Sequence, residues 1–473
     1  MPQVDAGHNW HLVLEDREQV IAALQRGECD GILPAAVGFF DEFGQFCLEL
    51  GLPQVLAKLP DPRRRRSIPA FLFATILVHK ALFRLRSLRL TSRVLFRSPD
   101  VLRRLGFNWR EIHEGFYRNG EQKPFNEEAL ADYVAGLTPA QLLRHQLQVA
   151  RHLRRELPEL FTDGVFALDC CDVRVPAGHF QRPEQHRKAC VLSLRYGGHA
   201  LPLIWRFVSD RTADVVAGRA LLKAAVQALG KGTIRLLLPD RGFLDGKWMG
   251  QLKRDHGIDT VIGVREDMDI FTDVLGLAEL HQHEWESAEP PKLHSKPLPE
   301  RCILGVRQLS TWEAYKGPLN ACLIRDAYPD KTLQQVAVST DTTMTAAQIH
   351  AHKRQRWELE ESFMEFARYW NVDHLGSCRP MVYAAQVHFT FLAFTLLFVF
   401  AARRDSPTGR LAAVVPMLVP SRELVVYWRG YYAILRPSEL LATILEHADA
   451  WQANRERLME ALRYCEGPPR GPP

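Results

Sequence analysis

Two apolar runs that each lead to an aspartate constrain this fold more than any other feature of the sequence. A strand is predicted over 165–168 and leads to Asp169, with residues 172–175 as a candidate continuation. A second strand is predicted over 234–238 and leads through Pro239 to Asp240. Short apolar runs of this kind are typical of strands buried on both faces of a sheet. Each strand is therefore expected to deliver one carboxylate to a sheet edge, where α/β proteins usually bind ligands.

The neighbouring segments predict a mixed sheet with helices on both faces. Further strands are expected at 188–196, 201–208 and 260–264, and the first two are joined by a Gly-Gly hairpin turn at 197–198. Amphipathic helices are expected at 213–229 and 243–255. Three consecutive strands followed by alternating helices and strands favour an α/β fold.

The length of 473 residues indicates two or three domains. Prolines and short alternating runs interrupt the α/β rhythm after the second aspartate, which predicts an inserted β-rich segment. The predicted parts are a helical, basic region at 1–158, an α/β core at 159–265, a β-rich insertion at 266–345, the rest of the core at 346–402, and a helical C-terminal region with a disordered tail at 403–473.

Arginine is concentrated in the first of these parts, although the net charge of the whole chain is only +5. Cationic side chains displace counterions from a phosphate backbone, so this composition favours binding to nucleic acid. Several short helices joined by tight turns predict a unit like a helix-turn-helix. A solvated helical surface is the alternative. The densest arginine run is Arg63, Arg64, Arg65 and Arg66.

The cysteines and the apolar segments bear on the compartment. Nine cysteines show no CxxC spacing, which argues against a zinc site and favours a reducing, cytoplasmic compartment. The first residues lack the pattern of a signal peptide. Residues 381–402 are uncharged and long enough to cross a membrane, but they include Gln386 and His388. We expect a buried helix and no membrane partner; a membrane protein built around this segment is the alternative.

A third acid, Glu360, lies on a helix predicted over 345–370. Arg356 precedes it by four residues and therefore shares its face of the helix. Three carboxylates suffice for Mg²⁺, which prefers oxygen ligands. Two such ions activate a water or a 3′-hydroxyl and stabilise the leaving oxygen of a phosphodiester. The alternative is that the aspartates are turn formers or helix caps and that the glutamate is an ordinary solvated acid.

This arrangement resembles the DDE transposases of bacterial insertion sequences, in particular the insertion sequence four group, whose β-rich insertion precedes the catalytic glutamate. Asp169 matches the first acid and Asp240, in an Asp-Arg-Gly-Phe motif, matches the second. The helix resembles the signature Y-x2-R-x3-E-x6-K through Arg356 and Glu360. The chain departs from it at Lys353, which replaces the tyrosine, at 367, where alanine replaces lysine, and at 170–171, where two cysteines follow the first acid.

The resemblance implies an RNase H-like core that cuts and rejoins DNA. It implies two Mg²⁺ or Mn²⁺ ions at Asp169, Asp240 and Glu360, and a homodimer bound to the terminal inverted repeats of its own element in the nucleoid. Trp312, or else Trp285, would stack a flipped base, although packing is the alternative for both. The other expected DNA contacts are Arg356, Lys353, Arg354, Arg368, Arg241 and Arg63 to Arg66.

Two other functions share these features. A metal-dependent nuclease of the same fold would use the same three acids and cut without rejoining. A transposase descendant that only binds DNA would keep the basic regions. The intact acids argue against a descendant that only binds DNA. A strand-transfer assay distinguishes a nuclease from a transposase.

Overall fold

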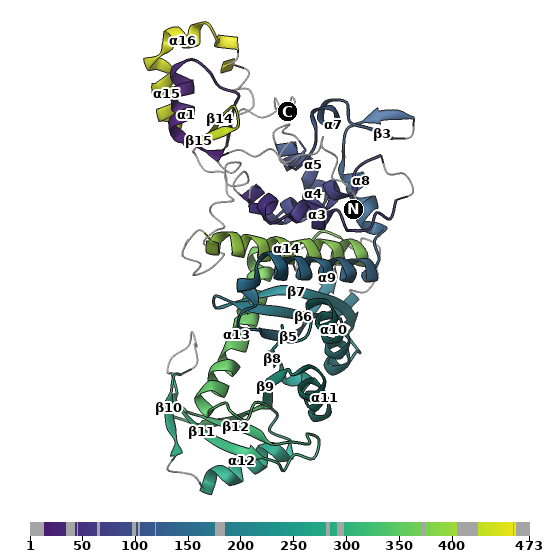
Figure 1. The fold of residues 1–473 in the computed structure, drawn as a ribbon, viewed down its shortest axis with the longest axis vertical. Helices are drawn as coiled ribbons and strands as arrows, with labels where there is room; N and C mark the ends of the chain where they lie inside the picture. The colour runs from purple at the N-terminus through teal and green to yellow at the C-terminus, as the bar shows by residue number, and fades with distance from the viewer. Residues whose placement is uncertain are drawn as a thin grey trace. The chain divides into compact units, whose positions relative to one another are not determined.

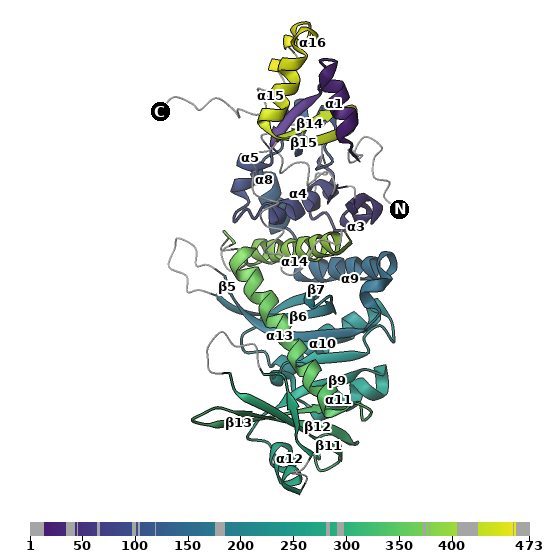
Figure 2. The ribbon, with the colours of Figure 1, turned by 90° about the vertical axis from the view of Figure 1, so that its left-hand side faces the viewer.

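The chain forms two compact units in the computed structural model, one of residues 142–368 and one that combines 1–141 with 369–473. Figures 1 and 2 show the elements of each unit. The structure describes residues 14–34, 43–44, 46–63, 67–96, 101–102, 105–118, 120–175, 185–280, 284–290, 298–370, 372, 375–377, 379–403, 424–456 and 458–459.

A mixed sheet of nine strands organises the 142–368 unit, in the order β10-β11-β12-β13-β9-β8-β5-β6-β7. The neighbours β5–β8 and β8–β9 are parallel, and the other pairs are antiparallel. The predicted mixed sheet flanked by helices is confirmed. The strands are β5 (Val165–Val175), β6 (Gln185–Tyr196), β7 (His199–Ser209), β8 (Leu236–Pro239), β9 (Asp259–Val264), β10 (Glu286–Ala288), β11 (Glu300–Leu309), β12 (Leu319–Ala327) and β13 (Thr332–Ser339).

Strand β5 includes the continuation that 172–175 suggested, so Asp169 lies inside the strand and not at its end. The reason is its partner: β6 pairs with β5 from Leu194 opposite Phe166 to Gln185 opposite Val175. The predicted turn between β6 and β7 is present. Gly197 and Gly198 both have positive φ, 56° and 78°, which is the backbone of a two-residue hairpin.

Helices of this unit pack on the sheet (Figure 1). Helix α10 lies close to it because Gly218 has no side chain. A Cβ there would come within 2.7 Å of the Phe243 ring and 3.0 Å of the Leu168 side chain. The helices of the unit are α9 (Pro139–Glu156, which begins in the other unit), η2 (Pro158–Phe161), α10 (Asp214–Leu229), η3 (Arg241–Phe243), α11 (Gly246–Gln251), the π-helical η4 (Leu252–His256), α12 (Asp269–Leu280) and α13 (Ala346–Tyr369).

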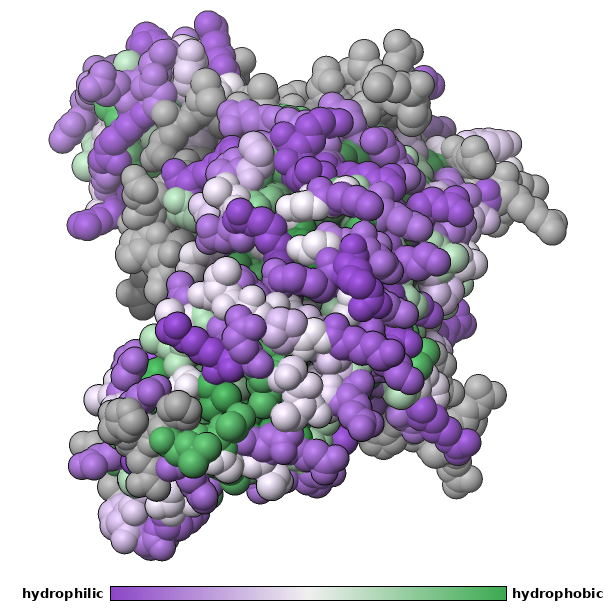
Figure 3. All heavy atoms as spheres, turned by 60° about the horizontal axis from the view of Figure 1, so that its bottom comes forward, coloured by the Kyte–Doolittle hydropathy of each residue, from purple (hydrophilic) through white to green (hydrophobic). Residues whose placement is uncertain are grey.

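The segment predicted as a β-rich insertion contains β10 to β13 and the helix α12. Its strands do not form a separate sheet, because β13 pairs with the core strand β9 from Val336 opposite Val264 to Ser339 opposite Val261. Figure 3 views this end of the unit and shows an apolar area among hydrophilic side chains. Among the described residues of this segment, the exposed large apolar side chains are Leu280, Leu298 and Leu333.

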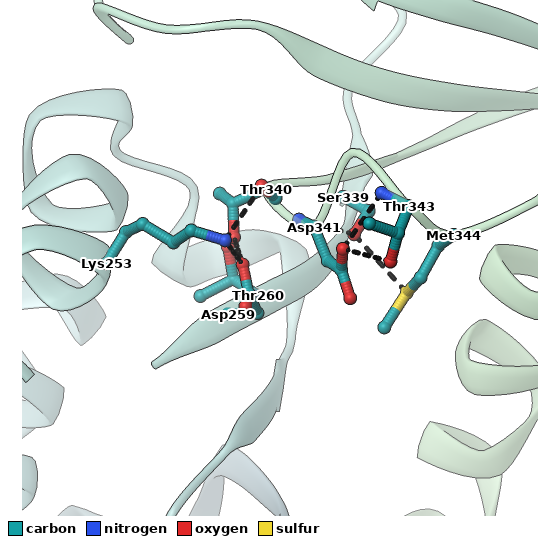
Figure 4. Close-up of polar contacts among 8 residues, drawn as sticks. All are labelled: Lys253, Asp259, Thr260, Ser339, Thr340, Asp341, Thr343 and Met344. Atoms are coloured by element: carbon teal, nitrogen blue, oxygen red, sulfur yellow. Dashed lines mark hydrogen bonds and ion pairs between the residues drawn. The ribbon is translucent and has the colours of Figure 1, made fainter. Parts of the chain in front are cut away.

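A polar network fixes the end of β13 against the start of β9 (Figure 4). The Asp259 carboxylate pairs with the Lys253 ammonium and accepts a bond from the Thr340 hydroxyl at 2.8 Å. The same hydroxyl accepts a bond from the Thr260 amide at 2.9 Å. Because α13 begins six residues after Thr340, this network also anchors the start of the helix that carries Arg356 and Glu360.

The other unit contains the apolar segment near 381–402 as the buried helix α14. Among the described residues, α14 is the one helix long and apolar enough to cross a membrane, and its apolar window is entirely buried. Helices α4 and α8 pack against it. The helices and the hairpin of this unit are α3 (Leu52–Leu56), α4 (Ala70–Leu82), α5 (Arg89–Val94), α7 (Trp109–His113), β3 (Phe116–Arg118), β4 (Glu121–Lys123), α8 (Glu127–Ala135) and α14 (Pro380–Arg403).

Both ends of the chain contribute strands, where the sequence analysis predicted helices only. A four-stranded sheet has the order β1-β15-β14-β2. The missed signal is a two-residue turn at Arg429 and Gly430, with φ of 45° and 86°, between two runs rich in Val, Ile and Tyr. The elements are β1 (Leu14–Glu15), α1 (Arg17–Gln25), β2 (Gly31–Pro34), β14 (Leu424–Trp428), β15 (Tyr431–Leu435), α15 (Pro437–Glu446) and α16 (Ala448–Gln452).

Side chains from both ends pack together around this small sheet. Val20, Ile32, Val426 and Trp451 belong to one buried cluster. The Trp451 indole donates to the carbonyl of Leu24 at 2.8 Å. The tail predicted to be disordered lies outside the described residues.

Candidate active site

The parallel pairing of β5 with β8 places Asp169 and Asp240 next to each other. The ladder ends with Leu168 opposite Pro239, and each aspartate is the next residue along the chain. The Asp240 amide donates to the Leu168 carbonyl at 3.0 Å. Proline suits the last position of β8 because it donates no ladder bond of its own.

The Asp240 carboxylate is not used as a helix cap. Asp240 is the residue before η3, but its side chain makes no capping bond with that helix. The Asp169 carboxylate accepts the amide of Cys170 at 2.7 Å, a contact with the adjacent residue. The reading of Asp240 as a cap is therefore not supported, and both carboxylates are directed to other partners.

Helix α13 completes the group, because Arg356 contacts all three predicted acids. Its Nη2 donates to Oε1 of Glu360 at 2.6 Å, as expected for neighbours one helical turn apart. Its Nη1 lies 3.3 Å from Oδ1 of Asp240 and 3.9 Å from Oδ2 of Asp169. One guanidinium thus gathers two carboxylates from the sheet and one from the helix.

Asp169 is the least exposed of the three acids, with 16% of its side chain exposed against 34% for Asp240 and 34% for Glu360. Burial, followed by the nearby Asp240 carboxylate, raises the pKa of Asp169 to about 7. Arg356 opposes this rise but does not cancel it. The site therefore carries a carboxyl group whose charge is poorly compensated at neutral pH.

The donor set suits a hard divalent cation, because it consists of carboxylates. In the part of the chain that the structure describes, however, no three acidic, histidine or cysteine side chains lie close enough to hold a metal ion as they stand. The Arg356 guanidinium lies among the three acids instead. The residues fit a divalent cation if that guanidinium moves away.

Comparison with protein families agrees with this geometry. Residues 161–396 match the family described as "Transposase DDE domain". This chain is a DDE transposase. No curated protein matches it. A similar solved structure is described as "Cryo-EM structure of piggyBac transposase synaptic complex with hairpin DNA", with a TM-score of 0.34 and 12% identity over 80% of this chain and 85% of that chain.

Several predicted DNA contacts of the transposase are engaged by its own residues. Lys353 bonds to the Gln335 side chain on β13, and burial lowers the pKa of Lys353 to about 8. Arg354 pairs with Glu289. In the other unit, Arg63 forms a salt bridge with Asp61 at 2.7 Å and lies over the Phe73 ring at 4.3 Å. These contacts hold the cations against neighbouring elements of the protein.

The remaining predicted contacts divide by exposure. Arg241 is exposed directly after Asp240 and is the predicted cation best placed to meet a phosphate at the acids. Trp312 is half-buried in the loop before β12, and Trp285 lies under the Arg325 guanidinium at 4.0 Å. Arg64 to Arg66 and the Arg368 side chain lie outside the described residues.

The structure adds a polar pair beside the acids that sequence reasoning missed. Lys188 on β6 donates to Asp214 at the start of α10 at 2.7 Å. A Cβ on Gly242 would come within 2.5 Å of Oδ2 of Asp214, so the glycine of the Asp-Arg-Gly-Phe motif makes room for this carboxylate. Gly242 was the one sign of this pair in the sequence, because a glycine suggests a close neighbour. That neighbour, Asp214, lies 28 residues away in sequence, so it could not be identified.

The two cysteines after the first acid, Cys170 and Cys171, are thiols on β5 and are half-buried. Cys170 lies opposite Cys190 in the β5–β6 ladder. A hydrogen bond with Cys190, together with burial, raises the pKa of the Cys170 thiol well above its ordinary value. A protonated thiol is a poor ligand for a hard cation, which leaves the carboxylates as the donors at this edge.

Proposed function

We propose that Asp169, Asp240 and Glu360 are the catalytic acids of this DDE transposase, and that they bind two divalent ions, Mg²⁺ or Mn²⁺. The observation that supports this most strongly is their convergence on one guanidinium from three separate elements. Divalent ions bound there would activate a water or a 3′-hydroxyl and stabilise the leaving oxygen of the phosphodiester.

The protein's own groups have distinct parts in this proposal. The two strand aspartates are held by the backbone of β5 and β8, so their positions are set before substrate arrives. Glu360 reaches the same place from α13, whose start is tied to the sheet by the Thr340 network. Arg241 is exposed beside Asp240 and would bind a phosphate of the DNA backbone.

Single substitutions test the assignment. Asp169→Ala, Asp240→Ala and Glu360→Ala should each abolish DNA cleavage in Mg²⁺ and leave DNA binding in a gel-shift assay nearly unchanged. Glu361→Ala is the matched control, because Glu361 is exposed on the same helix and is expected to retain cleavage. Near-normal cleavage by any one of the first three would remove that residue from the site.

Direct metal contact has a separate test. Asp240→Cys should be inactive in Mg²⁺ and regain cleavage in Mn²⁺, because a thiolate is a poor ligand for the harder ion. Cleavage that stays absent in both metals, with binding of DNA intact, would argue against Asp240 as a ligand.

We further propose that the substrate is the pair of terminal inverted repeats of the protein's own element, joined by a homodimer. Membership of the insertion sequence four group and a cytoplasmic location at the nucleoid belong to the same proposal. The arginine-rich sequence before residue 105 and the β-rich segment before Glu360 support it. DNA that flanks the coding region supplies the test substrate, and strand transfer of a pre-cleaved end distinguishes this function from that of a nuclease.

A further inference from the structure

The position of Arg356 has a consequence for metal binding. Its guanidinium nitrogens lie 2.6 Å from Glu360, 3.3 Å from Asp240 and 3.9 Å from Asp169. A divalent ion such as Mg²⁺ needs carboxylate oxygens of the same group at about 2.1 Å. The guanidinium and the ions therefore compete for the same oxygens.

We propose that Arg356 is a positioning residue that holds the three carboxylates together before metal binds and is displaced from Asp169 and Asp240 by the incoming ions. This inference rests on the proposed function, because it takes the three acids as metal ligands. Like charges in one place repel each other, so a metal-free group of three carboxylates needs a counter-ion to stay assembled. Arg356 is the cation that contacts all three.

The unequal contacts indicate how the exchange proceeds. Arg356 is bound tightly to Glu360, on its own helix, and more loosely to the two sheet aspartates. Rotation about its side-chain bonds can release Asp169 and Asp240 while the bond to Glu360 is kept. The guanidinium is also 23% exposed, so solvent reaches it without any opening of the sheet. The aspartates are therefore the first acids to pass to a metal ion.

Mn²⁺ binding to the full-length protein without DNA tests the proposal. Binding is measured at pH 8 by electron paramagnetic resonance. Free Mn²⁺ gives the signal, so the signal falls as the ion binds. Arg356→Gln should lower the dissociation constant about ten-fold, because the competing cation is gone. Arg354→Gln removes the same charge two residues away, where the partner is Glu289, and should change the constant less than about two-fold.

A second readout separates this role from a merely structural one. Metal-free Arg356→Gln should unfold at a lower temperature than the wild-type protein. Saturating Mn²⁺ should remove this difference in unfolding temperature, since the ions replace the lost counter-ion. Arg356→Lys keeps the positive charge but lacks the planar guanidinium. Its Mn²⁺ dissociation constant and its unfolding temperature should lie between those of the wild-type protein and Arg356→Gln. A structural role alone predicts a loss of stability that Mn²⁺ does not restore.

The outcomes distinguish failure of this inference from failure of the proposed function. Unchanged or weaker Mn²⁺ binding in both Arg356→Gln and Arg356→Lys overturns the competition and leaves the catalytic assignment in place. If Asp169→Asn binds Mn²⁺ as tightly as the wild-type protein, the acids are not the ligands, and the proposed function falls with this inference.

Discussion

The substitution Asp169→Asn should stabilise the metal-free protein at alkaline pH, although it removes a proposed catalytic group. Burial and the Asp240 carboxylate raise the pKa of Asp169 from 3.8 to about 7, a difference of roughly three units. Each unit corresponds to about 1.36 kcal/mol, so ionised Asp169 costs about 4 kcal/mol of folding free energy. The side chain is only 16% exposed, so screening by solvent reduces this little.

The sign of the pH dependence follows from the direction of the shift. The folded-state pKa lies above the unfolded one, so the folded protein holds the proton more tightly. The stabilisation from this group is complete below about pH 4 and is lost as pH rises through 7. The wild-type protein should lose this stability between about pH 4 and pH 7, and the asparagine variant should not.

Urea unfolding in the presence of a chelator, at pH 4.5 and pH 8.5, measures the effect. At pH 8.5 the Asp169→Asn variant should be more stable than the wild-type protein by about 3–4 kcal/mol, and at pH 4.5 by only about 1 kcal/mol. Asp267→Asn is the control; the Asp267 side chain is 75% exposed and should show no such difference. Saturating Mn²⁺ should reverse the order, because only the wild-type protein has the full set of ligands.

An asparagine variant that is no more stable than the wild-type protein at pH 8.5 would refute a destabilising charge at Asp169. A difference that is the same at both pH values would refute it as well. Either result would mean that burial and carboxylate repulsion at Asp169 do not oppose folding.

Three further predictions concern the framework. Burial lowers the pKa of Lys80 to about 7, so the free energy of unfolding should rise with pH between 7 and about 10.5. In urea unfolding, Lys80→Met should abolish that slope and add about 5 kcal/mol at pH 6. Arg301→Met leaves the 4% exposed Asp326 side chain unpaired and should cost about 3–5 kcal/mol by the same measurement. Gly246→Ala places a Cβ 2.6 Å from the backbone carbon of Ala314; it should cost about 1–3 kcal/mol and speed hydrogen exchange in the loop 310–318.

The core sheet was predictable because its signals are local. Apolar runs, the Gly-Gly turn and the glycine after α10 identify the strands and helices from β5 to β9 one by one. The aspartates then follow from the parallel pairing of β5 and β8. The continuation of β5 through Asp169 to Val175 was only partly predictable, because it depends on how far β6 pairs beside it.

The arrangement around Arg356 was only partly predictable. Its spacing from Glu360 gives the contact within α13, whereas its reach to Asp169 and Asp240 depends on how the sheet holds α13. The use of Lys353 and Arg354 as contacts to Gln335 and Glu289 is likewise a property of packing between distant segments. Sequence periodicity gives the face of a helix but not the residues that this face meets.

The sheet shared by the two chain ends affects how the protein can be made. The Asp16 amide donates to the Tyr432 carbonyl at 3.0 Å, across more than 400 residues of sequence. A ribosome that has synthesised α1 must add nearly the whole remaining chain before β14 and β15 emerge to meet it. Nascent α1 therefore lacks its partners β14 and β15 during most of translation. A gene copy truncated near its 3′ end would disturb the folding of the amino-terminal segment as well.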